Sequence, residues 1–348
     1  MTRILYGVIS LGKGHLIRSK VVIDYLKKKK HEVLILTSGE GYKYFKKYYD
    51  EVYNIEGFEI SFKKNSVLNF KTFMTNLKKA SKRTYNQLLN VKDKIGKFKP
   101  QLVITDMESF TSFIANENKI PLMHIDNQHF IVYGRYNYAD KYRFTRFKAL
   151  IIVKGIIFQG KHKLVMCLPG QEIINKLNVF KIKPIVRPEI MNSKPKSEDY
   201  VFVYQSTKSY DKLIDILKRI NYKFIIYGFD VNKKVGNLIF KKFNDNKEFL
   251  SDLVNCKAVI TNGGFTLISE AIYLEKPLLV VPIKKHFEQI LNALYVQDNK
   301  YGEFYTDLNE NHVVDFIMNL KRYKYKVDKW DNEQTFALID MLIKKEKL

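Results

Sequence analysis

A chain of 348 residues and 41.1 kDa is longer than one ordinary hydrophobic core and is expected to form two domains. Its composition, 46% hydrophobic and 28% charged, excludes wholesale disorder, and no apolar run approaches the roughly 20 residues that span a bilayer. The net charge of +24, from 60 Lys and Arg against 36 Asp and Glu, fits a polyanionic partner, either nucleic acid or an acidic membrane surface. It fits equally well a lysine-rich surface that is only solvated.

The positive charge is concentrated in the first half of the chain. Residues 1–163 hold 31 Lys and Arg against 13 Asp and Glu, a net charge of +18, which leaves +6 for residues 164–348. The two halves are therefore expected to have different tasks. Only two cysteines are present, Cys167 and Cys256, which excludes a disulfide scaffold or a cysteine metal site and suits a reducing cytoplasm.

Apolar runs alternate with amphipathic stretches along the first half, the pattern of βα units around a parallel sheet. The N-terminal run lacks a cleavage site and is interpreted as a first strand rather than a signal peptide. Strands are expected at 4–9, 32–37, 101–105 and 121–125, with helices at 15–29, from about 41, at 70–94 and at 109–117.

The pattern pauses at the proline-containing stretch 181–199, the best linker candidate, and then restarts. Strands are expected at 200–204, 223–228, 258–261 and 277–282, with helices from about 208, 247, 266 and 286. The segment 332–348 is expected to form a helix that crosses back onto the first domain. The predicted fold class is α/β, with two Rossmann-like domains, 1–185 and 186–331, facing across a cleft. Ligands of such sheets bind beyond the carboxyl ends of the strands.

The strongest motif lies within residues 257–293. A strand ends at Thr261, and Asn262, Gly263 and Gly264 follow as a turn whose missing Cβ atoms let a ligand approach the backbone. The next helix directs its free N–H groups and positive dipole end at that ligand, which makes an anion site. A tight turn without any ligand would have the same residues, so the turn alone is weak evidence.

Polar residues on the next two helices complete the motif. Glu270 lies four residues after Thr266 on one helix face, where a carboxylate suits a pair of ribose hydroxyls. After the following strand, Glu288, Gln289 and Asn292 supply partners for sugar hydroxyls.

Together these residues resemble the donor-site signature of GT-B glycosyltransferases that use nucleotide-sugars, specifically the MurG-type and UDP-glycosyltransferase-like branch. The similarity in element order extends over nearly the whole chain, and its specific motifs occupy the N-terminal loop and residues 187–302. The resemblance implies a GT-B fold in which the second domain binds a UDP-sugar and the first binds a hydroxyl acceptor. It also implies no metal and no other cofactor.

The resemblance implies donor-binding roles for residues of the second domain. They are Phe249 against the nucleobase, Glu270 on the ribose, Gln289 with Glu288 and Asn292 on the donor sugar, Thr266 with Gly263 and Gly264 at the diphosphate or ribose, and Arg187 near the phosphates or base. The chain departs from the family at two places. Ser206 and Thr207 replace the glycine-rich phosphate loop, where their hydroxyls can still bind phosphate, and Phe265 stands where a small residue is commoner.

A second motif follows the first strand, where Gly12 and Gly14 bend the chain and His15 enters the next helix. Glycosyl transfer to a hydroxyl needs a base, and histidine is suited to that role. The loop matches the family's N-terminal glycine-rich loop, in which this histidine acts as base or lines the acceptor site. A helix-capping role would explain the same residue without chemistry.

Carboxylates and histidines follow two further strands of the first half. Asp106 and Glu108 come after one strand, and Asp126 and His129 after the next, so they should converge with His15 at one edge of the sheet. Asp106 is expected to orient His15 as in a triad. Glu108, Asp126 and His129, with Gly12 and Gly14, are expected to bind the acceptor. No HxxxH or HExxH pair is present, and no metal site is expected.

Two basic stretches interleaved with aromatic and aliphatic residues lie at 62–83 and 135–158. They suit peripheral docking on anionic lipid, single-stranded nucleic acid, or a solvated helix face with buried aromatics. Neither matches a known nucleic-acid-binding signature, so no nucleic-acid partner is expected.

The sequence thus predicts an inverting, metal-independent glycosyltransferase that moves a sugar from a UDP-sugar to a hydroxyl acceptor, lipid-linked or in a cell-envelope glycan. It is expected in the cytoplasm, with peripheral contact to the inner face of the membrane. Two alternatives stay open: a nucleotide-sugar 2-epimerase of the same architecture, and a non-catalytic module that binds nucleic acid or membrane.

Overall fold

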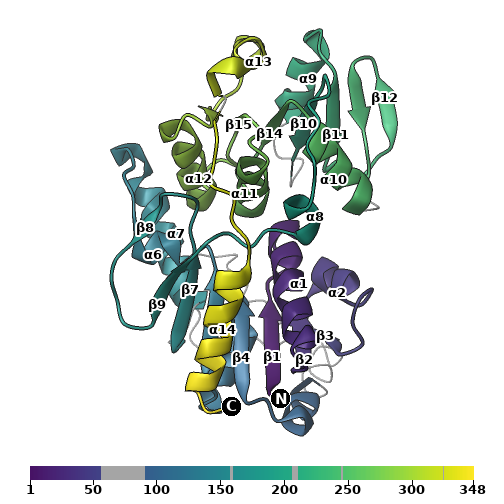
Figure 1. The fold of residues 1–348 in the computed structure, drawn as a ribbon. Coiled ribbons are helices and arrows are strands. Elements are labelled where there is room, and N and C mark those ends of the chain that lie inside the picture. The colour runs from purple at the N-terminus through teal and green to yellow at the C-terminus, as the bar shows by residue number, and fades with distance from the viewer. Residues whose placement is uncertain (56–90, 157–159, 206–210, 244–245, 324) are drawn as a thin grey trace, which may run out of the picture. The chain divides into compact units, whose positions relative to one another are not determined.

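The computed structural model describes residues 1–55, 91–156, 160–205, 211–243, 246–323 and 325–348. The chain divides into two units, shown as a ribbon in Figure 1. The first unit comprises Met1–Tyr136, Arg146–Ile185 and Asn332–Leu348, and the second comprises Asn137–Thr145 and Val186–Asp331. The basic stretch 62–83, most of the expected helix 70–94, and both Ser206 and Thr207 lie outside the described residues.

The first unit is built on a parallel sheet of seven described strands. In spatial order they are β3 (Val52–Asn54), β2 (Glu32–Thr37), β1 (Arg3–Val8), β4 (Leu102–Asp106), β5 (Leu122–Asp126), β7 (His162–Met166) and β9 (Val179–Ile182). A two-stranded antiparallel ribbon joins β6 (Gly134–Arg135) to β8 (Glu172–Ile173). The four strands expected from the sequence are confirmed, and β4 and β5 are neighbours whose carboxyl ends meet at one edge.

The central strand β1 explains why the sheet is closely covered. Its residues Ile4, Leu5, Tyr6 and Val8 are all buried, as expected for a parallel strand with helices on both faces. A Cβ atom at Gly7 would lie 2.1 Å from the Thr111 hydroxyl oxygen. Only glycine therefore allows the helix that carries Thr111 to pack this close to the strand.

Helices accompany the strands of the first unit. They include α1 (Lys13–Lys28), α2 (Gly39–Phe45), α5 (Ser109–Glu117), α6 (Phe130–Tyr133), the 3₁₀ turn η1 (Asp140–Tyr142), α7 (Arg143–Ile156) and α14 (Glu333–Lys345). The turn η1 and the first three residues of α7 belong to the second unit.

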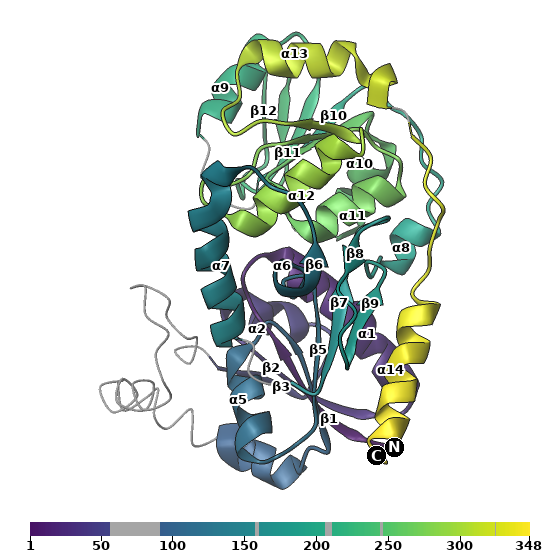
Figure 2. The same cartoon turned by 90° about the vertical axis from the view of Figure 1, so that its left-hand side faces the viewer.

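The C-terminal helix α14 packs on the first unit, beside the N-terminal elements (Figures 1 and 2). The rings of Tyr25 on α1 and Phe336 on α14 stack with centroids 3.9 Å apart. The Tyr25 hydroxyl donates to Asp340 at 2.7 Å, and Glu346 pairs with the buried His162 at 2.7 Å. These contacts fix the last segment of the chain to the first unit.

The second unit has its own sheet of seven described strands. In spatial order they are β12 (Lys233–Val235), β13 (Leu238–Phe240), β11 (Phe224–Tyr227), β10 (Val201–Tyr204), β14 (Ala258–Thr261), β15 (Leu278–Val280) and β16 (Gly302–Phe304). All neighbours are parallel except the edge pair β12 and β13. Its helical elements are α8 (Pro188–Met191), α9 (Asp211–Arg219), α10 (Asn246–Asn255), α11 (Phe265–Tyr273), α12 (Phe287–Asp298), α13 (Glu310–Met318) and the 3₁₀ turn η2 (Leu320–Tyr323).

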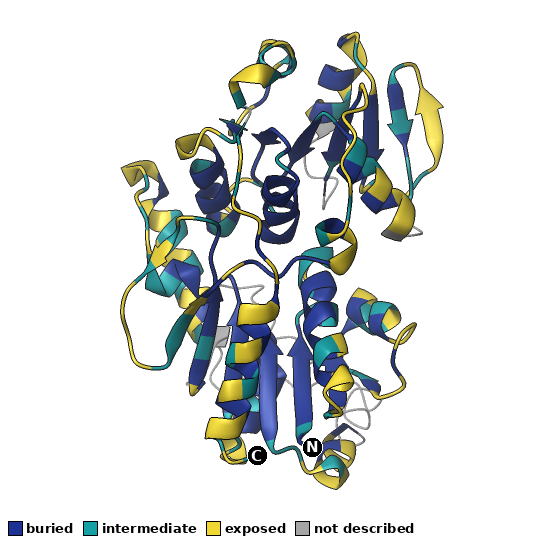
Figure 3. Cartoon of the chain, in the orientation of Figure 1, coloured by how far each residue is buried: buried dark blue, intermediate teal, exposed yellow. Residues whose placement is uncertain are grey.

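Burial is greatest at the centre of each sheet, where Figure 3 shows the strands in dark blue. Every residue of α11 is buried as well, so this helix is part of the core of the second unit. Among the described helices none is long and apolar enough to cross a membrane.

One assignment differs from the expected domain limits. Residues 137–145, expected in the first domain, belong to the second unit. A contact within that unit accounts for this, because the Tyr138 ring meets the Phe287 ring edge-on with centroids 5.6 Å apart.

Candidate active site

The loop after β1 brings His15 into the first turn of α1. Gly12 precedes the helix with φ +82°, a conformation that favours glycine, and Gly14 lies in the same turn. Asp106 is the last residue of β4, the strand hydrogen-bonded to β1. The helix start and the strand end therefore meet at the carboxyl edge of the sheet, where ligands of such folds bind.

His15 and Asp106, 91 positions apart in the sequence, are in direct contact. His15 Nδ1 lies 2.8 Å from Asp106 Oδ1. Asp106 is buried, whereas His15 keeps part of its ring accessible. When Nδ1 carries the proton and donates it to this carboxylate, the other ring nitrogen is available as a base, the arrangement that a hydroxyl acceptor requires.

Arg18 is a member of this cluster that the sequence interpretation did not include. It lies three residues after His15, on the same face of α1. Its Nε and Nη2 atoms donate to the two carboxylate oxygens of Asp106, each at 2.6 Å, and Nη1 donates to Asn127 Oδ1 at 2.5 Å. Burial alone would raise the pKa of Asp106, but the Arg18 guanidinium and His15 outweigh that effect and hold it well below its usual value. Asp106 is therefore a carboxylate at every physiological pH.

The turn after β5 completes the cluster. Asp126 Oδ1 accepts from the His129 backbone N–H at 2.8 Å, and Asp126 Oδ2 lies 2.8 Å from His129 Nδ1. Both side chains are buried. Burial opposes ionisation of Asp126, but His129 overcomes it and lowers the pKa. This pair, expected at the acceptor, closes the turn that carries Asn127 and Gln128 toward α1.

Residues of β5 and of the turn after it form a group that could hold a metal ion. Ligand atoms of His124, Asp126 and His129 all lie within 4.8 Å of one another, and all three residues are buried. Two imidazoles and a carboxylate are a set that zinc accepts. In the structure His129 uses Nδ1 on Asp126, which leaves its buried Nε2 as the ring nitrogen that could face an ion. The expectation that no metal is bound stays a prediction.

Glu108 has a different place from the one expected. It caps α5: its carboxylate accepts from the backbone N–H groups of Phe110 at 2.8 Å and Thr111 at 2.7 Å, and from the Thr111 hydroxyl. Burial raises the pKa of this carboxyl, against the effect of those hydrogen bonds. Because the helix start already occupies both oxygens, the structure gives Glu108 a local structural role.

In the second unit, Gly263 and Gly264 lie in the turn between β14 and α11. Gly263 has φ +95°, and a Cβ there would lie 3.0 Å from the Gln289 carbonyl oxygen. Asn292 Nδ2 donates to the Gly263 carbonyl at 3.0 Å. Gly264 is the N-cap of α11 and supplies no side-chain cap, so the first turn of that helix, including the buried Thr266, starts without one.

Arg187 and Glu270, expected to contact different parts of a nucleotide, contact each other. Arg187 Nε and Nη2 donate to the two oxygens of Glu270 at 2.7 and 2.6 Å, and both side chains are buried. The Arg187 guanidinium also lies over the Phe249 ring, 5.9 Å from its centroid. Phe249 is itself buried among aromatic rings, including Phe202 and Tyr227.

The remaining expected donor residues lie at the start of α12. Gln289 is buried, and its Oε1 accepts from the Ile283 backbone N–H at 2.9 Å. Glu288 is half-buried beside it. These contacts hold the loop after β15 against the turn at Gly263.

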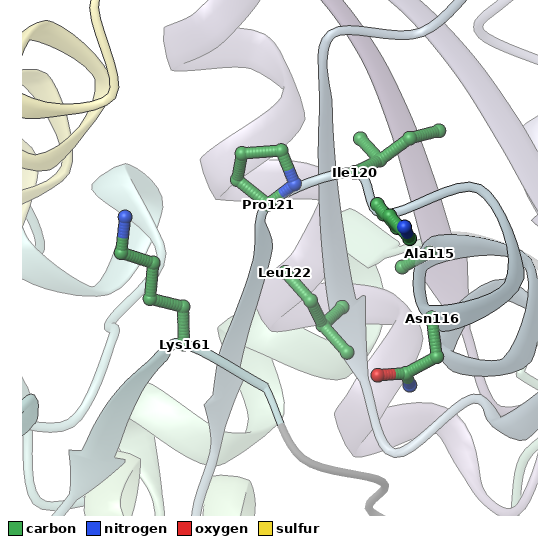
Figure 4. Close-up of a pocket in the computed structure, with 7 residues that line it drawn as sticks. Ala115, Asn116, Ile120, Pro121, Leu122 and Lys161 are labelled. Carbon is green, nitrogen blue, oxygen red and sulfur yellow. The ribbon is translucent and has the colours of Figure 1, made fainter.

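A separate pocket of about 360 Å³ lies at the amino end of β5 (Figure 4). Its lining includes Asn116 and Ile120 from the end of α5, Leu122 from β5 and Lys161 before β7. Since this is the opposite end of the strand from Asp126, the pocket contains none of the candidate site residues.

A family model described as glycosyl transferase family 1 matches residues 2–321. The chain belongs to glycosyl transferase family 1. A search of curated proteins finds no match. Because it belongs to this family, the protein is a glycosyltransferase, and solved structures confirm the expected GT-B fold.

Three of those structures illustrate the likeness of this glycosyltransferase. Spinosyn rhamnosyltransferase SpnG is 13% identical, with 92% of this chain and 93% of that chain covered and a TM-score of 0.58. SnogD from Streptomyces nogalater is 12% identical, with 98% and 100% covered and a TM-score of 0.58. MurG from Acinetobacter baumannii is 15% identical, with 97% and 99% covered and a TM-score of 0.58. At these identities the likeness concerns the fold.

Proposed function

We propose that this glycosyltransferase moves a sugar from a UDP-sugar to a hydroxyl acceptor with inversion at the anomeric carbon and without a metal. The contact of His15 Nδ1 with Asp106 at 2.8 Å carries the proposal. His15 Nε2 takes the proton of the acceptor hydroxyl as its oxygen bonds to the anomeric carbon. The bond from that carbon to the diphosphate breaks on the opposite face, and the nucleotide leaves with the electron pair.

The leaving diphosphate is assigned to the turn at Gly263 and Gly264. Backbone N–H groups in the first turn of α11 stabilise the negative charge that develops on the leaving group. Glu270 lies on the same helix and is assigned to the ribose. Its bidentate contact with Arg187 fixes the orientation of the carboxylate.

The nucleotide is tested by a thermal-shift screen of the full-length chain. We expect UDP and UDP-sugars at millimolar levels to raise the melting temperature, with the same result in EDTA. Thymidine diphosphate belongs in the screen because a structure of SpnG contains it. No shift with any nucleotide would contradict a donor site at Glu270. Formation of free UDP and an epimerised sugar in a reaction without acceptor would favour a 2-epimerase activity instead.

We propose that the reaction takes place in the cytoplasm, with the enzyme docked on anionic lipid. The exposed side chains of α7 support this setting. Phe144 is 67% and Phe147 58% exposed, and with Ile151 they lie on one helix face. Arg143, Lys148 and Lys154 are exposed on the same helix. Aromatic and basic side chains together suit the interface of an acidic bilayer, the place where a lipid-linked acceptor would be found.

Vesicle co-sedimentation tests this setting. We expect binding to phosphatidylglycerol vesicles that weakens with salt, and loss of that binding in Phe147→Ser/Ile151→Ser. The matched control is Met318→Ser, another exposed apolar side chain, on α13. Equal binding to phosphatidylcholine, or tighter salt-sensitive binding to an oligonucleotide, would contradict docking on anionic lipid.

A further inference from the structure

Gln128 contacts the ring nitrogen on which the proposed reaction depends. Its Nε2 lies 3.3 Å from His15 Nε2, and the side chain is buried in the turn after β5. We propose that Gln128, oriented by Arg18, holds His15 in the tautomer that can act as a base and marks the place of the acceptor hydroxyl. The place of the acceptor hydroxyl rests on the proposed function, whereas the tautomer of His15 does not.

The other ring nitrogen of His15 has two neighbours with opposite demands. Nδ1 lies 2.8 Å from Asp106 Oδ1, which can only accept, and 2.9 Å from Arg18 Nη2, which can only donate. A proton on Nδ1 satisfies Asp106 and leaves Nε2 with a lone pair. A bare Nδ1 would satisfy Arg18 and would put the proton on Nε2, where it would abolish the base. The contacts at Nδ1 alone therefore do not determine which of the two tautomers His15 adopts.

The amide of Gln128 favours the tautomer that carries the proton on Nδ1. Arg18 Nη2 lies 3.4 Å from Gln128 Oε1. Because a guanidinium has no acceptor, the oxygen end of the amide faces Arg18 and the NH₂ end faces His15. An NH₂ group at His15 Nε2 requires a lone pair there. The proton of a neutral imidazole is then on Nδ1, where it is donated to Asp106.

Hydrogen bonds of the neighbouring residues hold the turn that carries Gln128 in place. Asp126 and His129 close the turn from inside, and Asn127 accepts from Arg18 Nη1 at 2.5 Å. Two neighbouring side chains of the turn thus contact the same guanidinium, which fixes the position of Gln128 relative to α1.

An acceptor hydroxyl must donate to the lone pair that Gln128 occupies. Its oxygen therefore takes the place of the amide nitrogen, and the displaced amide remains close enough to hydrogen-bond the acceptor. Gln128 is in this sense a positioning residue for His15 and an acceptor contact once the substrate is bound.

Gln128→Glu is the most discriminating change. A carboxylate cannot donate to Nε2 and instead favours a proton there. The charged groups already near the ring are Asp106 from β4, Arg18 from α1, and the Asp126–His129 pair behind the turn. We expect the acidic limb of the pH–rate profile to move to higher pH. At neutral pH kcat should fall about tenfold or more, and the loss should be recovered under alkaline conditions.

Gln128→Leu is the matched control, since it removes the amide without adding charge. We expect kcat to fall by a few-fold, because both neutral tautomers are then populated, together with a raised KM for the acceptor and an unmoved pH profile. A purely structural role for Gln128 would instead lower the melting temperature and the activity of both variants alike. An unmoved profile in Gln128→Glu, or matching profiles in the two variants, would overturn the inference.

NMR of the ¹⁵N-histidine-labelled chain tests the tautomer without donor or acceptor. The His15 signals are assigned by their loss in His15→Gln. We expect a protonated Nδ1 and a bare Nε2 in the wild type, and a proton on Nε2 in Gln128→Glu. A wild-type proton on Nε2 overturns the inference even if sugar transfer is observed. The expected tautomer without any sugar transfer leaves the role of Gln128 at His15 intact and refutes the proposed function.

Discussion

His15→Ala is expected to lower kcat by roughly 10²–10⁴-fold, the usual contribution of a positioned general base. Nucleotide binding should be unchanged, because His15 lies in the first unit and the residues assigned to the donor lie in the second. The loss should appear in kcat rather than in KM for the nucleotide-sugar. Steady-state kinetics together with a nucleotide titration by calorimetry separate the two effects.

The control for this variant is Lys20→Ala, on the next turn of the same helix, where the lysine forms a surface pair with Asp24. We expect it to behave as wild type, since such pairs contribute little. If His15→Ala kept the wild-type rate, His15 would be excluded as the base. A loss of nucleotide binding in the same variant would place His15 at the donor instead.

Glu270→Ala is expected to have two separable effects. It leaves the Arg187 guanidinium buried without its carboxylate, which costs about 3–5 kcal/mol of stability. It also removes the group assigned to the ribose, so nucleotide affinity should fall. The midpoint of urea denaturation reports the first effect, and calorimetric titration of UDP at a temperature where the variant is folded reports the second.

The double variant Arg187→Met/Glu270→Leu distinguishes these effects. Replacing both partners of a buried ion pair with apolar residues restores most of the stability, whereas the ribose contact stays lost. A Glu270→Ala protein as stable as wild type would contradict the buried pair. A double variant that binds UDP as tightly as wild type would contradict the role of Glu270 at the donor.

The fold was predictable because its central strands are apolar and parallel. Runs such as residues 32–37 and 258–261 are buried on both faces, and burial of that kind shows directly in the sequence. The short strands β3, β12, β13 and β16, each of three residues, were missed because so few residues establish no period.

The contact of Asp106 with His15 was expected from the sequence, whereas the other contacts of the candidate site were not. Glycines and acids at strand ends indicated where ligands bind, since that rule follows from topology. Arg18 resembles any polar residue within an amphipathic helix until Asp106, 88 positions away, is placed against it. The pairing of Arg187 with Glu270 was hidden for the same reason. Glu108 directly precedes α5, and this N-cap position was the available signal for its structural role.

The most direct test of the account is transfer of isotope-labelled sugar from UDP- and thymidine-diphosphate-sugars to hydroxyl-bearing lipids in phosphatidylglycerol vesicles, with EDTA present. Mass spectrometry of the acceptor identifies the product, and NMR of its anomeric proton gives the configuration. We predict one labelled sugar on the acceptor for each nucleoside diphosphate released, with the anomeric configuration inverted, and a loss of that product in His15→Ala. Nucleotide release that yields only free or epimerised sugar, whatever the acceptor, would contradict it.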